Sequence, residues 1–158
     1  MSRVQLALNV ADLHEAVAFY SKLFGTGPAK LRPGYANFAV AEPPLKLVLI
    51  EDAGREPGSL NHLGVEVETT GEVAAATERL AGAGLATAVE EGVACCYAVQ
   101  DKVWVHGPGG EPWEVYAVLA DTATTTGQRR ADSPSGAACC APGPDPAAAV
   151  EAPSPSCC

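Results

Sequence analysis

Residues 5–10 read QLALNV, and residues 62–67 read HLGVEV. Both stretches alternate apolar residues with polar or small ones, which is the pattern of a strand with two different faces. A segment with helical spacing follows each stretch, at residues 13–24 and at residues 71–81. Because the second strand and helix repeat the first after 57 residues, the sequence predicts two related halves.

Three short strands are expected after each helix, separated by turns rich in proline and glycine. They span residues 28–32, 35–41 and 44–51 in the first half, and residues 86–91, 97–106 and 111–119 in the second. The order β-α-β-β-β, written twice, predicts an α+β fold that curves around a cavity. Its two modules, residues 1–51 and 61–119, are joined by residues 52–60 and form one domain over residues 1–119.

The composition narrows the possible partners and the location. The chain has 158 residues and a net charge of −9, which disfavours binding to nucleic-acid phosphates. The N-terminus begins directly in the first strand pattern, without the features of a secretion signal. No stretch approaches the roughly 18 apolar residues that span a bilayer. We therefore expect a cytoplasmic protein that binds neither nucleic acid nor membrane and is a monomer or a homodimer.

The C-terminal part of the chain has a different composition. Ala, Pro, Ser, Gly and Thr dominate from Thr122 onward, and no apolar periodicity remains, so residues 120–158 are predicted to form a disordered tail. The tail contains the cysteine pairs Cys139-Cys140 and Cys157-Cys158, and a third pair, Cys95-Cys96, lies in the domain. In a reducing cytosol, adjacent thiols are better interpreted as sites for soft ligands than as disulfides.

Three polar side chains are candidates for one metal site. By strand alternation, Gln5, His62 and Glu114 each lie on the polar face of an expected strand. They form no local motif, but His62 occupies the place in its half that Gln5 has in the first. One imidazole nitrogen and two oxygens suit a divalent metal. The set is close to the facial triad of Fe(II) oxygenases, with an amide in place of one histidine.

The duplicated β-α-β-β-β pattern resembles the vicinal oxygen chelate superfamily, which includes glyoxalase I and the extradiol dioxygenases. The resemblance covers residues 3–119 and is carried by the first strand, by residues 61–65 (NHLGV) and by residues 109–116 (GGEPWEVY). It implies that Gln5, His62 and Glu114 are the metal ligands. Aligning Pro44 with Pro112 places Lys46 opposite Glu114, so the fourth protein ligand of glyoxalase I is missing.

The pair Cys95-Cys96 is a candidate site for a thiophilic atom such as trivalent arsenic, Cd, Zn or Hg. Neighbouring residues of a regular strand point to opposite faces, so both thiols can bind one atom only at a bulge or turn, which Gly92 favours. The alternative is that both are small apolar core residues. Lys102 and Asp101 are interpreted as charges at a strand edge.

The combination of a chelate-superfamily domain, the segment ACCY at residues 94–97 and a tail with paired cysteines is similar to the ArsI group of carbon–arsenic lyases. The similarity implies Fe(II)- and dioxygen-dependent cleavage of the carbon–arsenic bond in trivalent organoarsenicals, such as methylarsenite or aromatic arsenicals, with release of arsenite. Cys95 and Cys96 would bind the arsenic.

Two other functions remain open at the level of sequence. The three cysteine pairs are also compatible with a non-catalytic binder of cadmium, zinc or arsenic. Another enzyme of the superfamily, such as a thiol transferase acting on an electrophilic antibiotic, would not need adjacent cysteines. His106, just before a glycine-rich turn, is either a proton donor near the metal or a solvated side chain.

Overall fold

The computed structural model describes residues 2–123 and contains the expected β-α-β-β-β order twice. The first half comprises β1 (Arg3–Val10), α1 (Leu13–Phe24), β2 (Lys30–Arg32), β3 (Tyr35–Val40) and β4 (Leu45–Glu51). The second half comprises β5 (Leu60–Val67), α2 (Thr70–Gly82), β6 (Ala88–Cys95), β7 (Ala98–His106) and β8 (Pro112–Asp121). The predicted α+β fold is confirmed.

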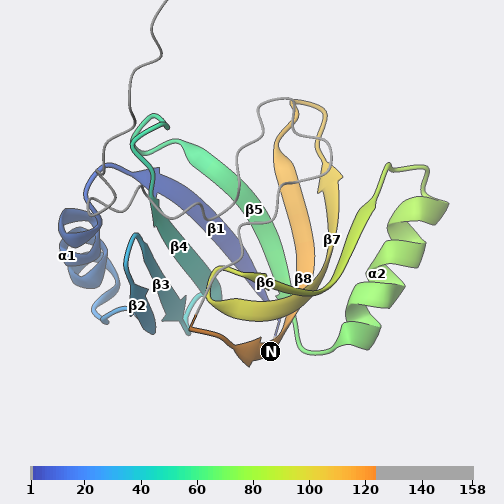
Figure 1. Ribbon diagram of the computed structural model, residues 1–158, viewed down its shortest axis with the longest axis horizontal. Coiled ribbons are helices and arrows are strands. Elements are labelled where there is room, and N and C mark those ends of the chain that lie inside the picture. The colour runs from blue at the N-terminus through green and yellow to red at the C-terminus, as the bar shows by residue number, and fades with distance from the viewer. Residues whose placement is uncertain (1, 124–158) are drawn as a thin grey trace, which may run out of the picture.

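All eight strands of the described region form one mixed sheet in the order β2-β3-β4-β1-β5-β8-β7-β6. The two halves meet where β1 and β5 pair in antiparallel fashion, and each of these strands pairs in parallel with the last strand of its own half. The sheet curls into an open half-barrel, and both helices lie on its outer side (Figure 1).

Local sequence signals set where the helices begin. Asp12 precedes α1, and its side chain accepts a hydrogen bond from the Glu15 N–H at 2.8 Å. Thr69 and Glu72 form a reciprocal capping box at the start of α2. Each helix therefore begins within one residue of its predicted start.

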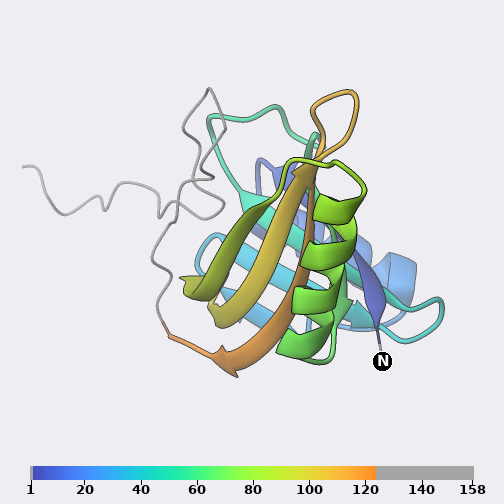
Figure 2. The same cartoon turned by 90° about the vertical axis from the view of Figure 1, so that its right-hand side faces the viewer.

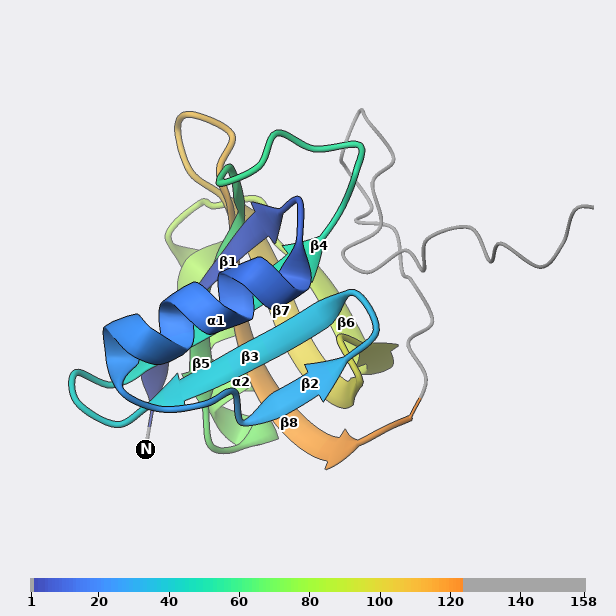
Figure 3. The ribbon, with the colours of Figure 1, turned by 90° about the vertical axis from the view of Figure 1, so that its left-hand side faces the viewer.

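The outer face of the sheet is apolar and packs against the helices. In Figure 2, α2 lies against β7 and β8, and in Figure 3, α1 lies across the strands of the first half. The buried cluster between α1 and the sheet consists of Leu13, Ala36, Phe38, Leu47 and Leu49. The buried cluster between α2 and the sheet consists of Val73, Ala76, Leu80, Val103 and Ala117. Because alternate residues of each strand point outward into these clusters, the residues between them point into the concave face.

The concave face is polar although it is buried. The buried polar side chains of the described region are Gln5, Asn9, Asn37, Lys46, His62, Gln100, Lys102 and Glu114. Buried polar groups of this kind require partners, since leaving one unpaired costs about 1–3 kcal/mol. The fold therefore devotes one face of the sheet to packing and the other to a polar network.

The pairing of β1 with β5 relates the two halves by an approximate two-fold axis. Gln5 pairs with Gly64, Leu6 with Leu63, and Ala7 with His62. These pairs map onto each other when residues 57 positions apart are exchanged. Gln5 and His62 are therefore structurally equivalent, as the sequence pattern predicts.

The strands β2 and β6 begin two residues later than expected, and two strands end later than expected. The strand expected at 86–91 continues to Cys95, because Gly92, with a φ of 60°, forms a bulge opposite β7 and does not end the strand. The last strand runs two residues further than expected, to Asp121. The two cysteine pairs of the predicted disordered tail lie outside the described residues. None of the helices in residues 2–123 has the length and apolar character needed to cross a bilayer.

Candidate metal and thiol site

Gln5, His62 and Glu114 come together on the concave face, each from a different strand. Gln5 Nε2 lies 2.9 Å from His62 Nε2 and 2.8 Å from Glu114 Oε1. The third side of the triangle, from His62 Nε2 to Glu114 Oε1, is 3.3 Å. All three side chains are at most 4% exposed.

The size of this triangle is that of three donor atoms around one divalent metal ion, although the Gln5 atom in it is the amide nitrogen, which does not bind a cation. Metal–ligand bonds of about 2.1 Å at right angles separate neighbouring donor atoms by about 3.0 Å. No three His, Cys, Asp or Glu side chains of residues 2–123 form a metal-binding group, so such a site depends on the amide of Gln5. Gly64 makes the close approach possible, since a Cβ there would lie 3.2 Å from Glu114 Cγ and 3.3 Å from Gln5 Nε2.

A chain of side chains orients His62. Its Nδ1 lies 2.7 Å from Asn61 Oδ1, and Asn61 Nδ2 donates to Asn9 Oδ1 at 2.8 Å. Asn9 in turn donates to Ser59 Oγ. Because the Asn61 oxygen can only accept, Nδ1 carries the proton and Nε2 presents its lone pair to the triangle. A hydrogen bond to the other ring nitrogen orients metal-binding histidines in the same way.

Lys102 neutralises the other side of the triangle. Its Nζ donates to Glu114 Oε2 at 2.8 Å, and the two side chains are 2% and 3% exposed. Burial alone would raise the pKa of Glu114, but the charge of Lys102 and the contact with His62 together outweigh it and hold that pKa well below its usual range. The interpretation of Lys102 as a strand-edge charge was therefore wrong. Lys102 shares its strand face with the buried side chains of Gln100 and Trp104, and this alternation could have identified it.

A second polar cluster holds the far end of Gln5. The Tyr116 hydroxyl lies 2.6 Å from Gln5 Oε1, 2.8 Å from Glu66 Oε2 and 3.0 Å from Lys46 Nζ. Arg3 and Lys46 both pair with Glu66 at 2.8 Å. Burial opposes the ionisation of Glu66, but Lys46 and the hydrogen bonds of the cluster lower its pKa to about 2. Burial, together with the charges of Glu114 and Glu66, raises the pKa of Tyr116, which keeps its proton.

The strand pairing corrects one expectation. Gly64, which pairs with Glu114, is equivalent to Ala7, and Ala7 pairs with Val48. The counterpart of Glu114 is therefore Val48, not Lys46, because the pairing makes Pro112 equivalent to Lys46 and not to Pro44. Val48 is 2% exposed and apolar, so the first half supplies no donor at this position.

The two domain cysteines lie at a turn and face each other. Cys95 ends β6, and its Sγ lies 3.2 Å from that of Cys96. Cys96 and Tyr97 have φ values of 55° and 60°, which characterise a two-residue hairpin turn and let adjacent side chains converge. The condition for two adjacent thiols to face one atom is therefore met, by a turn at Cys96–Tyr97 and not by Gly92. Cys95 packs on Trp104, whose ring meets that of His62 edge-on at 5.6 Å, so Trp104 separates the thiols from the triangle.

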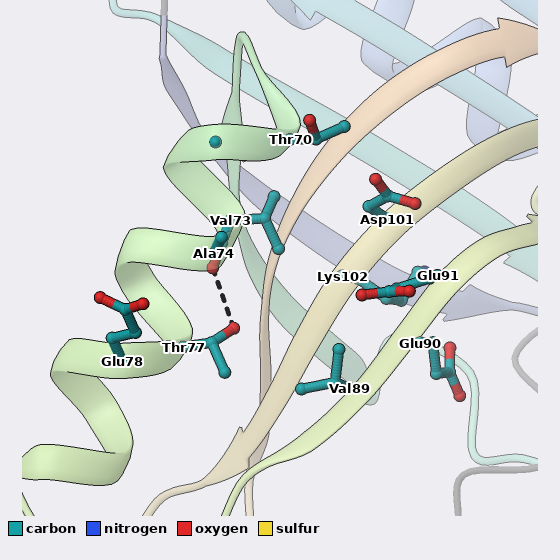
Figure 4. A pocket seen from close by; sticks show the side chains of 11 residues that line it. Thr70, Val73, Ala74, Thr77, Glu78, Val89, Glu90, Glu91, Asp101 and Lys102 are labelled. Carbon is teal, nitrogen blue, oxygen red and sulfur yellow. Dashed lines mark hydrogen bonds between the residues drawn. The ribbon is translucent and has the colours of Figure 1, made fainter.

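Two of the cavities differ in whether they border the cysteine pair. A groove of about 640 Å³ lies between α2 and β6–β7, with Val73, Val89 and several acidic residues along it (Figure 4). Lys102, the partner of Glu114, also lines this groove, but Gln5, His62, Glu114 and the two cysteines do not. A smaller cavity of about 180 Å³ lies beside Cys96 and is also lined by Gln100 and Lys46. His106 is exposed at the opposite end of β7 from the cysteine turn, which agrees with a solvated side chain.

Residues 3–115 match the family model of the Glyoxalase/Bleomycin resistance protein/Dioxygenase superfamily. A Thermomonospora curvata protein named "Trivalent organoarsenical cleaving enzyme" is 65% identical over 90% of this chain and 90% of its own length. "Cadmium-induced protein CadI" of Mycobacterium bovis is 61% identical over 89% of this chain and 93% of its own. The Mn(II)-bound glyoxalase of Novosphingobium aromaticivorans shares the fold, with a TM-score of 0.56 and 20% identity over 80% of this chain and 43% of that one. The chain therefore belongs to the Glyoxalase/Bleomycin resistance protein/Dioxygenase superfamily.

Proposed function

We propose that this protein cleaves the carbon–arsenic bond of trivalent organoarsenicals and releases arsenite, with Fe(II) as its cofactor and dioxygen as its second substrate. The observation that carries the proposal is the pair of thiols 3.2 Å apart, in contact with Trp104 and through it with the Gln5–His62–Glu114 triangle. The relative from Thermomonospora curvata, whose name states that it cleaves trivalent organoarsenicals, supports the choice of substrate class.

Cys95 and Cys96 would bind the arsenic atom of the substrate. Two thiolates this close can bind one trivalent arsenic and leave its third substituent, the organic group, in place. The ammonium of Lys102 lies close enough to both sulfurs for their negative charge, when they are thiolates, to stabilise it. The thiolate is the form that binds soft atoms.

Gln5, His62 and Glu114 would hold the Fe(II). Bound there, the ion would supply the binding and activation of dioxygen, for which a triad leaves coordination positions open. The chain contributes the orientation of each donor: Asn61 fixes the ring of His62, and Lys102 fixes the carboxylate of Glu114. Val48 keeps the first half from adding a donor that would close the site.

The cavity beside Cys96 provides room for a small organic group. Its volume is about 180 Å³, and a cavity of about 150 Å³ is enough for benzene in another protein. Gln100 lines it, and its Oε1 is buried without a hydrogen-bond partner in the described residues. Methylarsenite and arsenicals with a single aromatic ring are therefore the proposed substrates.

The test is a single-turnover experiment. Reduced protein is loaded anaerobically with Fe(II) and methylarsenite, dioxygen is added, and the arsenic species are separated and measured. The proposal expects arsenite, and its absence from iron-loaded, reduced protein rejects the proposal. Cys95→Ser and Cys96→Ser should lose arsenite release but keep Fe(II) binding. The double variant Cys139→Ser/Cys140→Ser makes the same chemical change in the tail and should keep turnover at saturating substrate.

A thiol-based binder is the second candidate, because the cysteine pair could bind a soft metal without any reaction. The same experiment distinguishes the two functions. A binder would take up methylarsenite or Cd(II) in a fixed ratio and return the arsenical unchanged after dioxygen is added.

A further inference from the structure

Gln5 presents the wrong end of its amide for a metal ion. Its Nε2 faces His62 Nε2 and Glu114 Oε1, while its Oε1 faces the Tyr116 hydroxyl. An amide NH₂ group has two donor hydrogens and does not bind a cation, whereas the amide oxygen does. A half-turn of the amide would exchange the two atoms without displacing the rest of the side chain.

The hydrogen count around Tyr116 favours the turned amide. The hydroxyl contacts Lys46 Nζ, Glu66 Oε2 and Gln5 Oε1, but it has one proton. Lys46 donates to it, so its proton can serve either Glu66 or Gln5, and the other short oxygen–oxygen contact is left without a hydrogen. With the amide turned, Gln5 Nε2 donates to Tyr116, and Tyr116 donates to Glu66. Each of the three contacts then contains one hydrogen.

The two ends of Gln5 therefore make competing demands. Without a metal, the acceptors on His62 and Glu114 require the NH₂ group, which is the arrangement observed. A cation between these acceptors removes that requirement, and Tyr116 then attracts the NH₂ group to its own side. Glu66 remains an acceptor throughout because Arg3 and Lys46 both pair with it.

We propose that Tyr116, oriented by Glu66, is a positioning residue that turns the Gln5 amide oxygen toward the metal when the ion binds. The inference rests on the metal site of the proposed function. On this view, the neutral Gln5 can bind the metal because Tyr116, which does not contact the ion, orients its amide.

Metal affinity in paired variants tests this. Co(II) is titrated anaerobically into full-length protein by calorimetry, and the visible Co(II) spectrum is recorded. Tyr116→Phe should weaken Co(II) binding about 10–100-fold, the usual effect of losing a side chain that hydrogen-bonds to a metal ligand. In a Gln5→Glu background both side-chain atoms are oxygens, so no orientation is needed. Tyr116→Phe should then change the affinity by no more than about twofold.

Tyr35→Phe is the matched control. Tyr35 is also buried on the concave face, and its hydroxyl accepts a hydrogen bond from Asn37 Nδ2. Its loss should leave Co(II) affinity unchanged. Tyr116→Phe with unchanged affinity overturns the proposal, and so does an equal loss in the Gln5→Glu background, which would indicate a general packing defect.

The unmutated protein offers a second measurement that does not depend on the folding of variants. The Gln5 side-chain NH₂ protons should show nuclear Overhauser contacts to the His62 ring without metal, and to the Tyr116 ring with bound Zn(II). Retention of the His62 contacts with bound Zn(II) overturns the proposal, and so does a failure of the site to bind any divalent metal. If metal binding depended on Tyr116 but no arsenite were released, the proposed function would be refuted, whereas the role of Tyr116 would stand.

Discussion

The two halves of the domain have the same topology but contribute unequally to the site. Their opening strands each provide one side chain to the triangle, Gln5 and His62. Their closing strands differ, because Glu114 completes the triangle in the second half whereas its counterpart Val48 is apolar. Duplication therefore provides the converging geometry, and a single replacement leaves one side of the metal position without a protein donor.

The hairpins before the closing strands differ even more. In the first half, β2 has three residues and turns through Pro33 and Gly34, where glycine readily adopts the φ of 68°. In the second half, β6 has eight residues and its turn carries Cys96 and Tyr97 at positive φ. Non-glycine residues in this conformation are disfavoured and often mark functional sites. The Tyr97 hydroxyl donates to the Pro33 carbonyl, so the longer hairpin reaches across to the shorter one.

The largest contrast is between two equivalent residues beside the closing strands: Lys102, which pairs with Glu114, and Tyr35, which pairs with Asn37. Lys102 in the second half is equivalent to Tyr35 in the first, since they pair with the equivalent residues Tyr116 and Ile50. Lys102→Met leaves the Glu114 carboxylate buried and unneutralised, which should lower the free energy of unfolding by about 3–5 kcal/mol. Tyr35→Phe breaks a neutral hydrogen bond and should cost about 1 kcal/mol. Urea denaturation of metal-free protein measures both.

Two further measurements sharpen this prediction. Adding Glu114→Gln to Lys102→Met should recover most of the lost stability, because the buried charge is gone. Saturating Co(II) should also reduce the loss in the single variant, since the cation replaces the ammonium. If Lys102→Met were as mild as Tyr35→Phe, the carboxylate would have another source of neutralisation.

Alternation along the strands assigns Gln5, His62 and Glu114 to one face, and the resemblance to the vicinal oxygen chelate superfamily singles them out from the other polar residues of that face. Alternation does not show that this face is buried. Lysine is usually solvated, so Lys102 resembles an edge residue until the sheet places it opposite Glu114. The amide orientation of Gln5 depends on Tyr116 and Glu66, which are distant in sequence from it and from each other.

The register of the strand pairing is the second feature that the sequence did not predict. Two prolines suggested that Lys46 is equivalent to Glu114, but strand pairing, not turn composition, fixes equivalence. Similarly, Gly92 resembles a strand end and is instead a bulge through which β6 continues to Cys95. Both errors come from interpreting turn residues without their pairing partners.

The missing donor of the first half can be supplied. Val48→Glu would place a carboxylate at the position equivalent to Glu114. Without metal, a carboxyl group at this buried position should cost about 2 kcal/mol or more. Bound Co(II) should recover that loss and bind more tightly than in the unmutated protein. Arsenite release should fall, because the added donor occupies a position that dioxygen needs.

Thermal denaturation with and without Co(II), together with the arsenite assay, checks these expectations. Val48→Leu serves as the matched control, as it alters the volume but adds no donor. Full activity with a tightly bound metal in the Val48→Glu variant would show that the open side of the triangle is elsewhere.

The two hairpin turns should give the smallest effect, of opposite sign in the two halves. A Cβ at Gly34 would meet no atom within 4 Å, so Gly34→Ala should lower the free energy of unfolding only through its positive φ, by about 1–2 kcal/mol. At Cys96 the unfavourable residue is already present. Cys96→Gly should therefore be more stable than Cys96→Ala by about 1 kcal/mol, with the lost thiol contacts cancelling between the two variants. Urea denaturation of the three variants tests this. If Cys96→Ala proved as stable as Cys96→Gly, the turn that brings the thiols together would be relaxed, and the second half would hold its site without conformational strain.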